Sequence, residues 1–468
     1  MQVFINGRWA PSAASEVLDV VDPYTEQVLA QVPVGHPADV DRAVAAARSA
    51  FPAWSRTPVS HRVDCLRLVA AGIRDRADEL ATTITAELGS PVVESRVTQV
   101  ALSVTGFEGV ADVVESYAFE EVIGNSLVLR EPAGVAACIT PWNYPLHQIT
   151  LKVASALAAG CTVALKPSEV TPLNARILTE ILSAAGLPDG VFNMVLGTGA
   201  TVGEALVAHP DVDVVSFTGS TRAGVRIATM AAQKVTRVCL ELGGKSASVV
   251  LDDGDLLTAV PETVRRCMTN SGQSCSALTR LLVPEDRMAE AAEIAAQTAR
   301  SLVLGDPTQE DTELGPLVSE QQRQRVRDLI DTGVDEGAVR VVGGSAPPPG
   351  LGHGYFVSPT VFAGVVPGMT IFQEEIFGPV LSICGYRDDH DAVAMANATA
   401  FGLSAAVWSE DPERARIVAR QLRSGQVTVN GGAYNFFAPF GGYKMSGLGR
   451  ESGRYGLEEF LEVKSLQT

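Results

Sequence analysis

Cys275 is the residue of this chain whose surroundings best suit covalent chemistry. It lies in the stretch N-S-G-Q-S-C-S-A (270–277), between two serines, whereas the other six cysteines lie mostly beside apolar residues. A thiolate is a strong nucleophile, although most free cysteines in proteins are buried and inert. The stretch alone therefore leaves two interpretations open, a reactive thiol or a small apolar side chain in a polar loop.

Two further residues have the chemistry that a nucleophile requires. Glu241 lies in V-C-L-E-L-G-G-K (238–245), where burial is expected to raise the carboxyl pKa towards values useful for a general base. Asn143 lies in the rigid turn P-W-N-Y-P (141–145), where its amide can donate a hydrogen bond to a developing oxyanion. Each has a simpler alternative, a strand-end glutamate in a salt bridge and an asparagine that stabilises its own turn.

Two glycine-containing loops suit a phosphate group to different degrees. G-T-G-A-T-V-G (197–203) is one residue too long for the dinucleotide fingerprint, and a tight turn explains it as well. S-F-T-G-S-T (216–221) lies between an apolar strand and a helix, so Ser220 and Thr221 stand at a helix N-terminus, which favours an anion. A plain N-cap is the alternative there. No lysine follows in the Walker A position, which excludes a nucleoside triphosphatase.

A third polar group, K-P-S-E (166–169), directly follows a short apolar strand at 162–166. A carboxylate just beyond a strand of a dinucleotide-binding sheet commonly accepts hydrogen bonds from ribose hydroxyls. Lys166 and Glu169 could therefore hold a ribose, or they could form a solvated surface pair.

Composition limits the class of protein. The 468 residues suggest roughly two to three domains, and 46% hydrophobic against 19% charged residues is typical of a folded globular protein. A net charge of −18 without basic blocks argues against nucleic-acid or anionic-membrane partners. The longest uncharged apolar run, 153–165, has 13 residues, fewer than the ~20 of a membrane helix. Seven cysteines without a C-x-x-C pair, and no visible secretory signal, predict a cytoplasmic protein without disulfides or zinc.

The elements that must position these residues follow an alternating pattern. Between 134 and 241, short β-branched runs alternate with helical stretches, which predicts a Rossmann-like parallel sheet with ligands at the carboxyl ends of its strands. A second α/β region runs from 246 to about 429, with a helix at 256–268. Segments 114–133 and 461–464 do not fit this alternation, so they are candidates for an oligomerisation arm.

Taken together, the chain resembles the aldehyde dehydrogenases of the large NAD(P)+-dependent superfamily, nearly from end to end. The resemblance rests on seven motifs that occur in order: P-W-N-Y-P (141–145), K-P-S-E (166–169), F-T-G-S-T (217–221), L-E-L-G-G-K (240–245), G-Q-S-C (272–275), E-E-I-F-G-P-V (374–380) and P-F-G-G-Y-K-M-S-G-L-G-R-E (439–451).

The resemblance implies a domain organisation and an assembly. Residues 1–113 and 134–242 would form a Rossmann-like NAD-binding domain, and 243–444 a second α/β domain that carries catalysis. Residues 114–133 and 445–468 would form a small β oligomerisation arm. The implied assembly is a homodimer or a homotetramer that acts on a small-molecule aldehyde.

The same resemblance implies a mechanism. Cys275 would attack the aldehyde carbonyl, and the Asn143 amide and the Cys275 backbone N–H would stabilise the oxyanion. Hydride transfer to the nicotinamide would leave a thioester, which Glu241-activated water would hydrolyse. Lys152 and Glu451 resemble a pair proposed to relay the proton from this base. The CoA-acylating branch generally lacks the glutamate, so a free carboxylic acid is the expected product.

The resemblance also assigns a cofactor site. Glu375 would hold the nicotinamide ribose with Phe377 nearby, and Ser220 the pyrophosphate. Glu169 at the adenosine ribose is poorly compatible with a 2′-phosphate, so NAD is expected, although Lys166 and Arg222 leave NADP possible. The full set of expected cofactor contacts is Thr140, Pro141, Trp142, Lys166, Ser168, Glu169, Gly199, Phe217, Thr218, Gly219, Ser220, Leu242, Gly243, Glu375 and Phe377.

The sequence leaves the aldehyde itself open. An aromatic-lined substrate tunnel is suggested by Tyr144, Tyr434, Phe436 and Phe437, and no arginine for a carboxylated aldehyde is evident. Two functions of other classes stay as alternatives. One is a cysteine-dependent esterase or hydrolase without redox chemistry, in which His147 would serve Cys275. The other is a non-catalytic, crystallin-like structural protein, which the presence of all three reactive residues disfavours.

Overall fold

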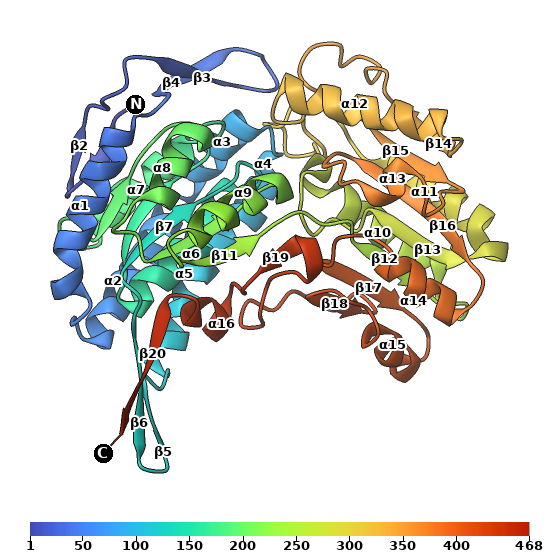
Figure 1. Cartoon of the computed structure of the whole chain (residues 1–468). Helices are drawn as coiled ribbons and strands as arrows, with labels where there is room; N and C mark the ends of the chain where they lie inside the picture. The colour runs from blue at the N-terminus through green and yellow to red at the C-terminus, as the bar shows by residue number, and fades with distance from the viewer. Residues whose placement is uncertain (468) are drawn as a thin grey trace.

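The chain folds into two α/β lobes with a narrow arm of strands projecting from one of them (Figure 1). The structure is a computed structural model, and it describes residues 1–467. The first lobe contains an eight-stranded sheet, the second a seven-stranded sheet, and the arm a three-stranded sheet. Both large sheets are mainly parallel and are covered by helices, which confirms the fold class expected from the alternating sequence pattern.

The sheet of the first lobe is doubly wound. Its five central strands are parallel in the order β9-β8-β7-β10-β11, so the direction of chain progress reverses between β7 and β10. Antiparallel strands complete both edges. The strands are β1 (Val3–Ile5), β2 (Arg8–Ala10), β7 (Val135–Ile139), β8 (Thr162–Lys166), β9 (Phe192–Met194), β10 (Val214–Thr218), β11 (Arg237–Glu241) and β19 (Gly447–Leu448).

Helices cover both faces of this sheet. Helices α2, α3, α5, α6 and α7 share one apolar cluster, whereas α1, α8 and α9 share the cluster on the opposite face. The helices are α1 (Pro37–Trp54), α2 (Val59–Asp75), α3 (Ala77–Leu88), α4 (Val92–Glu94), α5 (Ala101–Glu115), α6 (Pro145–Ala159), α7 (Leu173–Ala184), α8 (Glu204–Ala208), α9 (Thr221–Ala232) and α16 (Gly453–Glu458), with π-helical turns at Ser95–Val100 and Gly199–Gly203.

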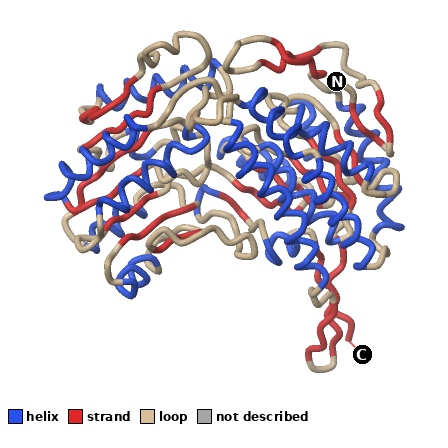
Figure 2. The backbone as a smooth tube through the Cα atoms, turned by 180° about the vertical axis from the view of Figure 1, so that it is seen from behind, coloured by secondary structure: helices blue, strands red, loops and turns tan. Residues whose placement is uncertain are grey.

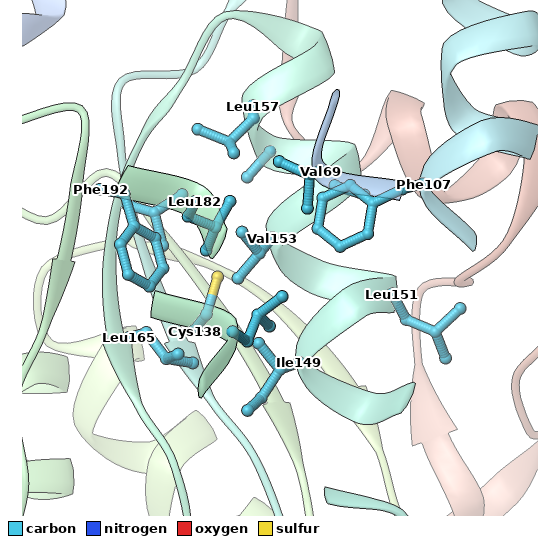
Figure 3. Packing of buried hydrophobic residues seen from close by; sticks show 14 of the residues in the cluster. Val69, Phe107, Cys138, Ile149, Leu151, Val153, Leu157, Leu165, Leu182 and Phe192 are labelled. Carbon is cyan, nitrogen blue, oxygen red and sulfur yellow. The ribbon is translucent and has the colours of Figure 1, made fainter. Parts of the chain in front are cut away.

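Helix α6 runs through the centre of the first cluster. Pro145 starts it at a position where a missing N–H costs nothing, and Gly160, with φ of 95°, ends it in the left-handed conformation. Figure 3 shows Val69 of α2 and Phe107 of α5 next to Val153 of α6. All residues of α6 are buried. Its one cation, Lys152, must therefore find a partner inside the protein.

The second lobe repeats the layered design. Its strands lie in the order β14-β15-β16-β13-β12-β17-β18, all parallel except β14. The strands are β12 (Ala247–Val250), β13 (Arg280–Pro284), β14 (Val339–Gly344), β15 (Ser358–Ala363), β16 (Val380–Tyr386), β17 (Ser404–Trp408) and β18 (Gln426–Val429). Its helices are α10 (Leu256–Met268), α11 (Met288–Ser301), α12 (Glu320–Asp335), α13 (Thr370–Gln373), α14 (Asp389–Asn397) and α15 (Pro412–Ala419), with 3-10 turns at Thr269–Gly272, Glu285–Arg287 and Lys444–Ser446.

The arm consists of β5 (Glu120–Ile123), β6 (Ser126–Pro132) and β20 (Leu461–Gln467), paired antiparallel in the order β20-β6-β5. Figure 2 shows it projecting below the first lobe, with the C-terminus beside it. The three paired strands cover fewer residues than the two segments, 114–133 and 445–468, that the sequence suggested for the arm. Residues 114–115 still belong to α5, and β19 pairs with β11 in the first sheet. A separate hairpin, β3 (Val17–Val21) and β4 (Val28–Pro33), lies near the N-terminus.

One helical stretch in residues 1–467, Val92–Glu115, is long and apolar enough to cross a membrane by length and composition. Half of its apolar window is buried inside the protein. Its C-terminal part, α5, packs on α2 and α6. This packing accounts for its apolar side chains, since helices in a protein core are as apolar as membrane spans.

Candidate active site

The cofactor-type cleft begins where chain progress in the first sheet reverses. The carboxyl ends of β7 and β10 diverge into P-W-N-Y-P (141–145) and T-G-S-T (218–221), and doubly wound sheets bind ligands at such a point. A cleft of about 410 Å³ opens there, with its opposite wall supplied by the second lobe. Of the expected site residues it is lined by Pro141, Trp142, Asn143, Thr218, Gly219, Ser220, Leu242, Gly243, Cys275, Glu375 and Phe377.

Two glycines at this cleft are in close contact with neighbouring side chains, which would have to shift to admit a larger residue. A Cβ on Gly219 would lie 2.5 Å from the Phe217 ring, and one on Gly243 would lie 2.3 Å from the Glu375 carboxylate. The backbone at both positions therefore stays open to a ligand. Across the cleft, Trp142 and Phe377 pack edge to face with their ring centroids 5.3 Å apart.

Ser220 caps helix α9 at this cleft. Its hydroxyl accepts a hydrogen bond from the Ala223 backbone N–H at 3.3 Å, and the first amides of the helix face the same region. A helix N-terminus of this kind favours phosphate, which is the group that a dinucleotide carries. The open backbone, the aromatic pair and the helix terminus together fit a nicotinamide dinucleotide.

Five of the remaining expected cofactor residues lie beyond this cleft, around the end of β8: Thr140, Lys166, Ser168, Glu169 and Gly199. The sixth, Phe217, lies on β10 next to Gly219. The Lys166 ammonium donates to the Glu169 carboxylate at 2.9 Å. Burial would raise the pKa of Glu169, but Lys166 and backbone amides, including that of Gly199, lower it overall. The structure thus brings Lys166, Glu169 and Gly199 together, and the pair is largely buried rather than solvated.

Cys275 follows a backbone turn that the sequence did not reveal. Asn270, Ser271 and Gly272 are successively left-handed, with φ of 52°, 55° and 75°, and left-handed residues other than glycine cost roughly 1 kcal/mol or more. Hydrogen bonds hold this turn. Ser271 Oγ donates to the Gly315 carbonyl at 2.7 Å, and Gln273 Oε1 accepts from the Val318 N–H at 2.9 Å. The polar run N-S-G-Q was the only signal of it.

Asn143 is tied to the same turn. Its Nδ2 donates to the Gln273 carbonyl at 3.1 Å, and its own carbonyl accepts from Asn270 Nδ2 at 2.9 Å. A side-chain amide has two N–H groups, so one remains for a ligand in the cleft. Asn143 is therefore hydrogen-bonded to the turn that precedes Cys275, which joins the first lobe to the second.

The Cys275 thiol lies between this cleft and a second, smaller pocket, because it lines both. Burial, with the nearby carboxylates of Glu375 and Glu241 acting in the same direction, raises the pKa of Cys275 to about 12. The thiol is therefore protonated at neutral pH. Loss of its proton requires an acceptor or a positive charge brought close to it.

Glu241 is buried at the end of β11, and neither of its carboxylate oxygens has a hydrogen-bond partner among the described residues. Burial raises the pKa of Glu241 well above its usual value, and Glu451 adds to the effect. Lys152 donates to Thr218 Oγ1 at 2.7 Å and forms a short ion pair with Glu451. Burial would lower the pKa of Lys152, but its attraction to Glu451 raises it overall.

Not every aromatic residue expected in a substrate tunnel lies there. Tyr144 and Tyr434 line the smaller pocket. Phe436 is instead buried in the core of the first lobe, where a Cβ on Gly109 of α5 would lie 2.7 Å from its ring. Phe437 packs on Phe436 with centroids 6.0 Å apart. The tunnel prediction is therefore wrong for Phe436, since the sequence shows an aromatic run but not its direction.

Comparison with known proteins gives a consistent result. The family model described as "Aldehyde dehydrogenase family" matches residues 9–466. A 3-succinoylsemialdehyde-pyridine dehydrogenase from a Pseudomonas species is 49% identical, with 99% of this chain and 98% of that protein covered.

Solved structures agree in fold and sequence. A mutant aldehyde dehydrogenase C from Pseudomonas syringae, complexed with NAD+ and octanal, is 48% identical with a TM-score of 0.99, covering 100% of this chain and 96% of the other. A betaine aldehyde dehydrogenase mutant from Staphylococcus aureus, in complex with NAD+, is 36% identical with a TM-score of 0.97, covering 100% and 97%.

Proposed function

This chain belongs to the aldehyde dehydrogenase family, and we propose that it oxidises an aldehyde to the carboxylic acid with NAD+ through a thioester on Cys275. The observation that carries the proposal is the position of Cys275, whose side chain lines both the dinucleotide-type cleft and the smaller pocket. A substrate in the smaller pocket and a cofactor in the cleft would thus meet at one sulfur atom. No observation favours a hydrolase without redox chemistry.

The cleft suits NAD+ through residues that differ in role. We assign Ser220 and the α9 N-terminus to the pyrophosphate, the Glu375 carboxylate to the nicotinamide ribose, and Lys166 with Glu169 to the adenosine ribose. NAD+ held by these residues would supply the acceptor for the two electrons and the hydrogen that leave the former aldehyde carbon. A carboxylate at 169 repels a 2′-phosphate, so we expect NAD+ to be preferred over NADP+.

The chain's own groups supply the covalent steps. The Cys275 thiol would release its proton to water in the cleft, and its sulfur would form a bond to the carbonyl carbon. The free N–H of the Asn143 amide, with the Cys275 backbone N–H, would stabilise the resulting oxyanion. Removal of one such donor typically lowers the rate by about 100- to 1,000-fold. Oxidation then leaves a thioester on Cys275.

Hydrolysis of the thioester needs a base, and we assign Glu241 to it. Its unpartnered carboxylate can take a proton from water, which attacks the thioester carbon, breaks the carbon–sulfur bond and restores the Cys275 thiol. The raised pKa of Glu241 makes it a stronger base than an exposed carboxylate. The Lys152–Glu451 pair lies next to Glu241, so we assign it to moving the proton onward.

We also propose how this enzyme is organised and where it works. Residues of the first lobe would bind the cofactor, the second lobe would complete catalysis, and the arm of β5, β6 and β20 would join subunits in a homodimer or homotetramer. All seven cysteines are free and six are buried, which supports a reducing, cytoplasmic location. The net charge of −18 supports the absence of nucleic-acid and anionic-membrane partners.

Replacement of the nucleophile tests the proposal. In Cys275→Ala we expect NADH formation from an aldehyde and NAD+, followed at 340 nm, to fall by at least about 10,000-fold, because no thioester can form. Cys65→Ala, which removes a buried thiol from α2, should keep wild-type activity. Wild-type activity in Cys275→Ala would disprove the mechanism.

A further inference from the structure

The smaller pocket beside Cys275, which we call the inner pocket, contains no charged side chain at neutral pH. Its volume is about 170 Å³, and it opens on the side of Cys275 away from the α9 N-terminus. Leu102, Leu151, Tyr434 and Phe440 supply apolar surface. The remaining lining residues include no aspartate, glutamate, lysine or arginine.

The one histidine of the inner pocket is also uncharged. His147 is buried in α6, and its ring Nδ1 has no hydrogen-bond partner within residues 1–467. Burial, with the nearby Lys152 cation acting in the same direction, lowers the pKa of His147 to about 4. It is therefore a neutral imidazole at pH 7, and it offers no positive charge to an anionic substrate group.

Acidic groups lie close to the two tyrosines of the pocket wall, and the Lys152 cation that acts on His147 is paired with Glu451. Burial raises the pKa of the Tyr144 hydroxyl, and Glu94 raises it further. Burial likewise raises the pKa of Tyr434, and Glu451 on the opposite side adds to this. A carboxylate placed between these two tyrosines would lose water and face acidic groups. Burial of an unpaired charge is strongly unfavourable.

The inner pocket continues into an outer vestibule of about 510 Å³, which shares Tyr144, Ser274, Ser276 and Tyr434 with it. Arg266 is the one charged residue in the lining of this vestibule. Its guanidinium already donates to Glu262 at 2.8 Å, so its charge is largely balanced. An anionic group thus finds no unpaired cation along the route to Cys275.

We propose that the inner pocket selects aldehydes that are uncharged near the carbonyl, carrying a medium-length apolar chain or a single aromatic ring. The size supports this class, because a cavity of about 150 Å³ lined by apolar residues holds benzene, and the inner pocket is slightly larger. This substrate class rests on the proposed function. It excludes short semialdehydes whose carboxylate would lie inside the pocket.

A matched pair of substrates tests, on the unmodified enzyme, whether the inner pocket discriminates against a charged aldehyde. We expect the methyl ester of succinic semialdehyde to be oxidised with a kcat/KM at least about 100-fold above that of succinic semialdehyde itself, because the two differ mainly in charge. Hexanal and benzaldehyde should be oxidised as efficiently as the ester. A ratio of ester to acid below tenfold would overturn the inference while leaving the proposed function intact. No oxidation of any of these aldehydes would contradict the proposed function instead.

A charge introduced into the pocket wall gives an independent check. Leu102 lies half-buried on α5 and lines the inner pocket, whereas the neighbouring Ala101 is exposed and does not line it. Leu102→Arg should reduce the ratio of ester to acid by at least about tenfold, since a cation now pairs with the carboxylate. Ala101→Arg, the matched control, should leave the ratio unchanged. An equal change in both variants would contradict the role of the pocket wall, and the wild-type ratio decides the proposal if Leu102→Arg does not fold.

Discussion

Glu241 illustrates how a single residue combines a structural cost with a chemical use. Its two carboxylate oxygens are buried without a donor, an arrangement that costs about 1–3 kcal/mol or more for a polar group. The adjacent Gly441 leaves room for this carboxylate, because a Cβ there would lie 2.4 Å from Glu241 Oε1. A buried, unpartnered carboxylate of raised pKa is a functional-site signal, and here it lies close enough to affect Cys275.

Glu241→Gln should separate the two halves of the reaction. We expect a burst of about one NADH per active site and then a turnover reduced by about 100- to 10,000-fold, because the thioester forms but no base activates water. In the wild type, turnover should rise with pH as Glu241 loses its proton, since only the carboxylate accepts one, and this rise should occur above the usual range of a glutamate. Glu241→Gln should show no such rise of turnover with pH.

Absorbance at 340 nm after rapid mixing measures both the burst of NADH and the slower steady-state turnover. Glu458→Gln, which changes a partly buried carboxylate bonded to Tyr117, serves as the control and should keep wild-type kinetics. Slow NADH formation without a burst in Glu241→Gln would assign Glu241 to thiol activation rather than to hydrolysis.

At the level of elements, the end of β8 determines what the cofactor cleft can accept. Strand β8 ends at Lys166, and the following turn returns Glu169 to the Lys166 ammonium at 2.9 Å. The π-helical turn at Gly199–Gly203 closes the same site, with the Gly199 amide directed to Glu169. A strand, a turn and a helix terminus thus present one carboxylate and one ammonium together.

Glu169→Ser should shift the choice of cofactor. Removal of the carboxylate leaves the Lys166 ammonium free for a 2′-phosphate, so we expect the ratio of kcat/KM for NADP+ to that for NAD+ to rise by at least about tenfold. Initial rates with each cofactor at saturating aldehyde measure it. Glu204→Ser, which alters an exposed ion pair with Arg226, should leave the ratio unchanged. An unchanged ratio in Glu169→Ser would show that Glu169 does not act at the adenosine ribose.

At the level of the whole molecule, the arm exposes apolar side chains that a single chain does not cover. Val122 is 75% exposed on β5 and Val463 is 69% exposed on β20. These two strands are the edges of the three-stranded sheet. Exposed apolar edges of this kind mark sites of association between chains, which supports the proposed oligomer.

Val122→Asp should weaken that association, because a buried, unpaired carboxylate at an interface is costly. We expect the molar mass, measured by light scattering after size-exclusion chromatography, to fall towards that of a smaller assembly. Val235→Asp is a matched control, since Val235 is 92% exposed in the loop after α9. A wild-type mass equal to one chain would contradict the proposed oligomer itself.

The sequence by itself identified several elements and singled out three residues whose roles stay proposals. The alternating apolar pattern identified strand 162–166 and helix 256–268 with the limits that the structure has, because backbone periodicity is local. Cys275, Glu241 and Asn143 also stood out, since their neighbours in the chain already implied a polar loop, a buried strand end and a rigid turn.

Only the tertiary structure decided how distant residues meet. The ion pair of Lys152 with Glu451 joins residues 299 positions apart, and β19 pairs with β11 instead of joining the arm. The left-handed turn before Cys275 depends on acceptors and donors from other segments, such as Gly315. Burial and sheet order set these contacts, and neither is encoded in a short window of sequence. For the same reason the uncharged inner pocket, formed by α5, α6 and two loops, became visible only after folding.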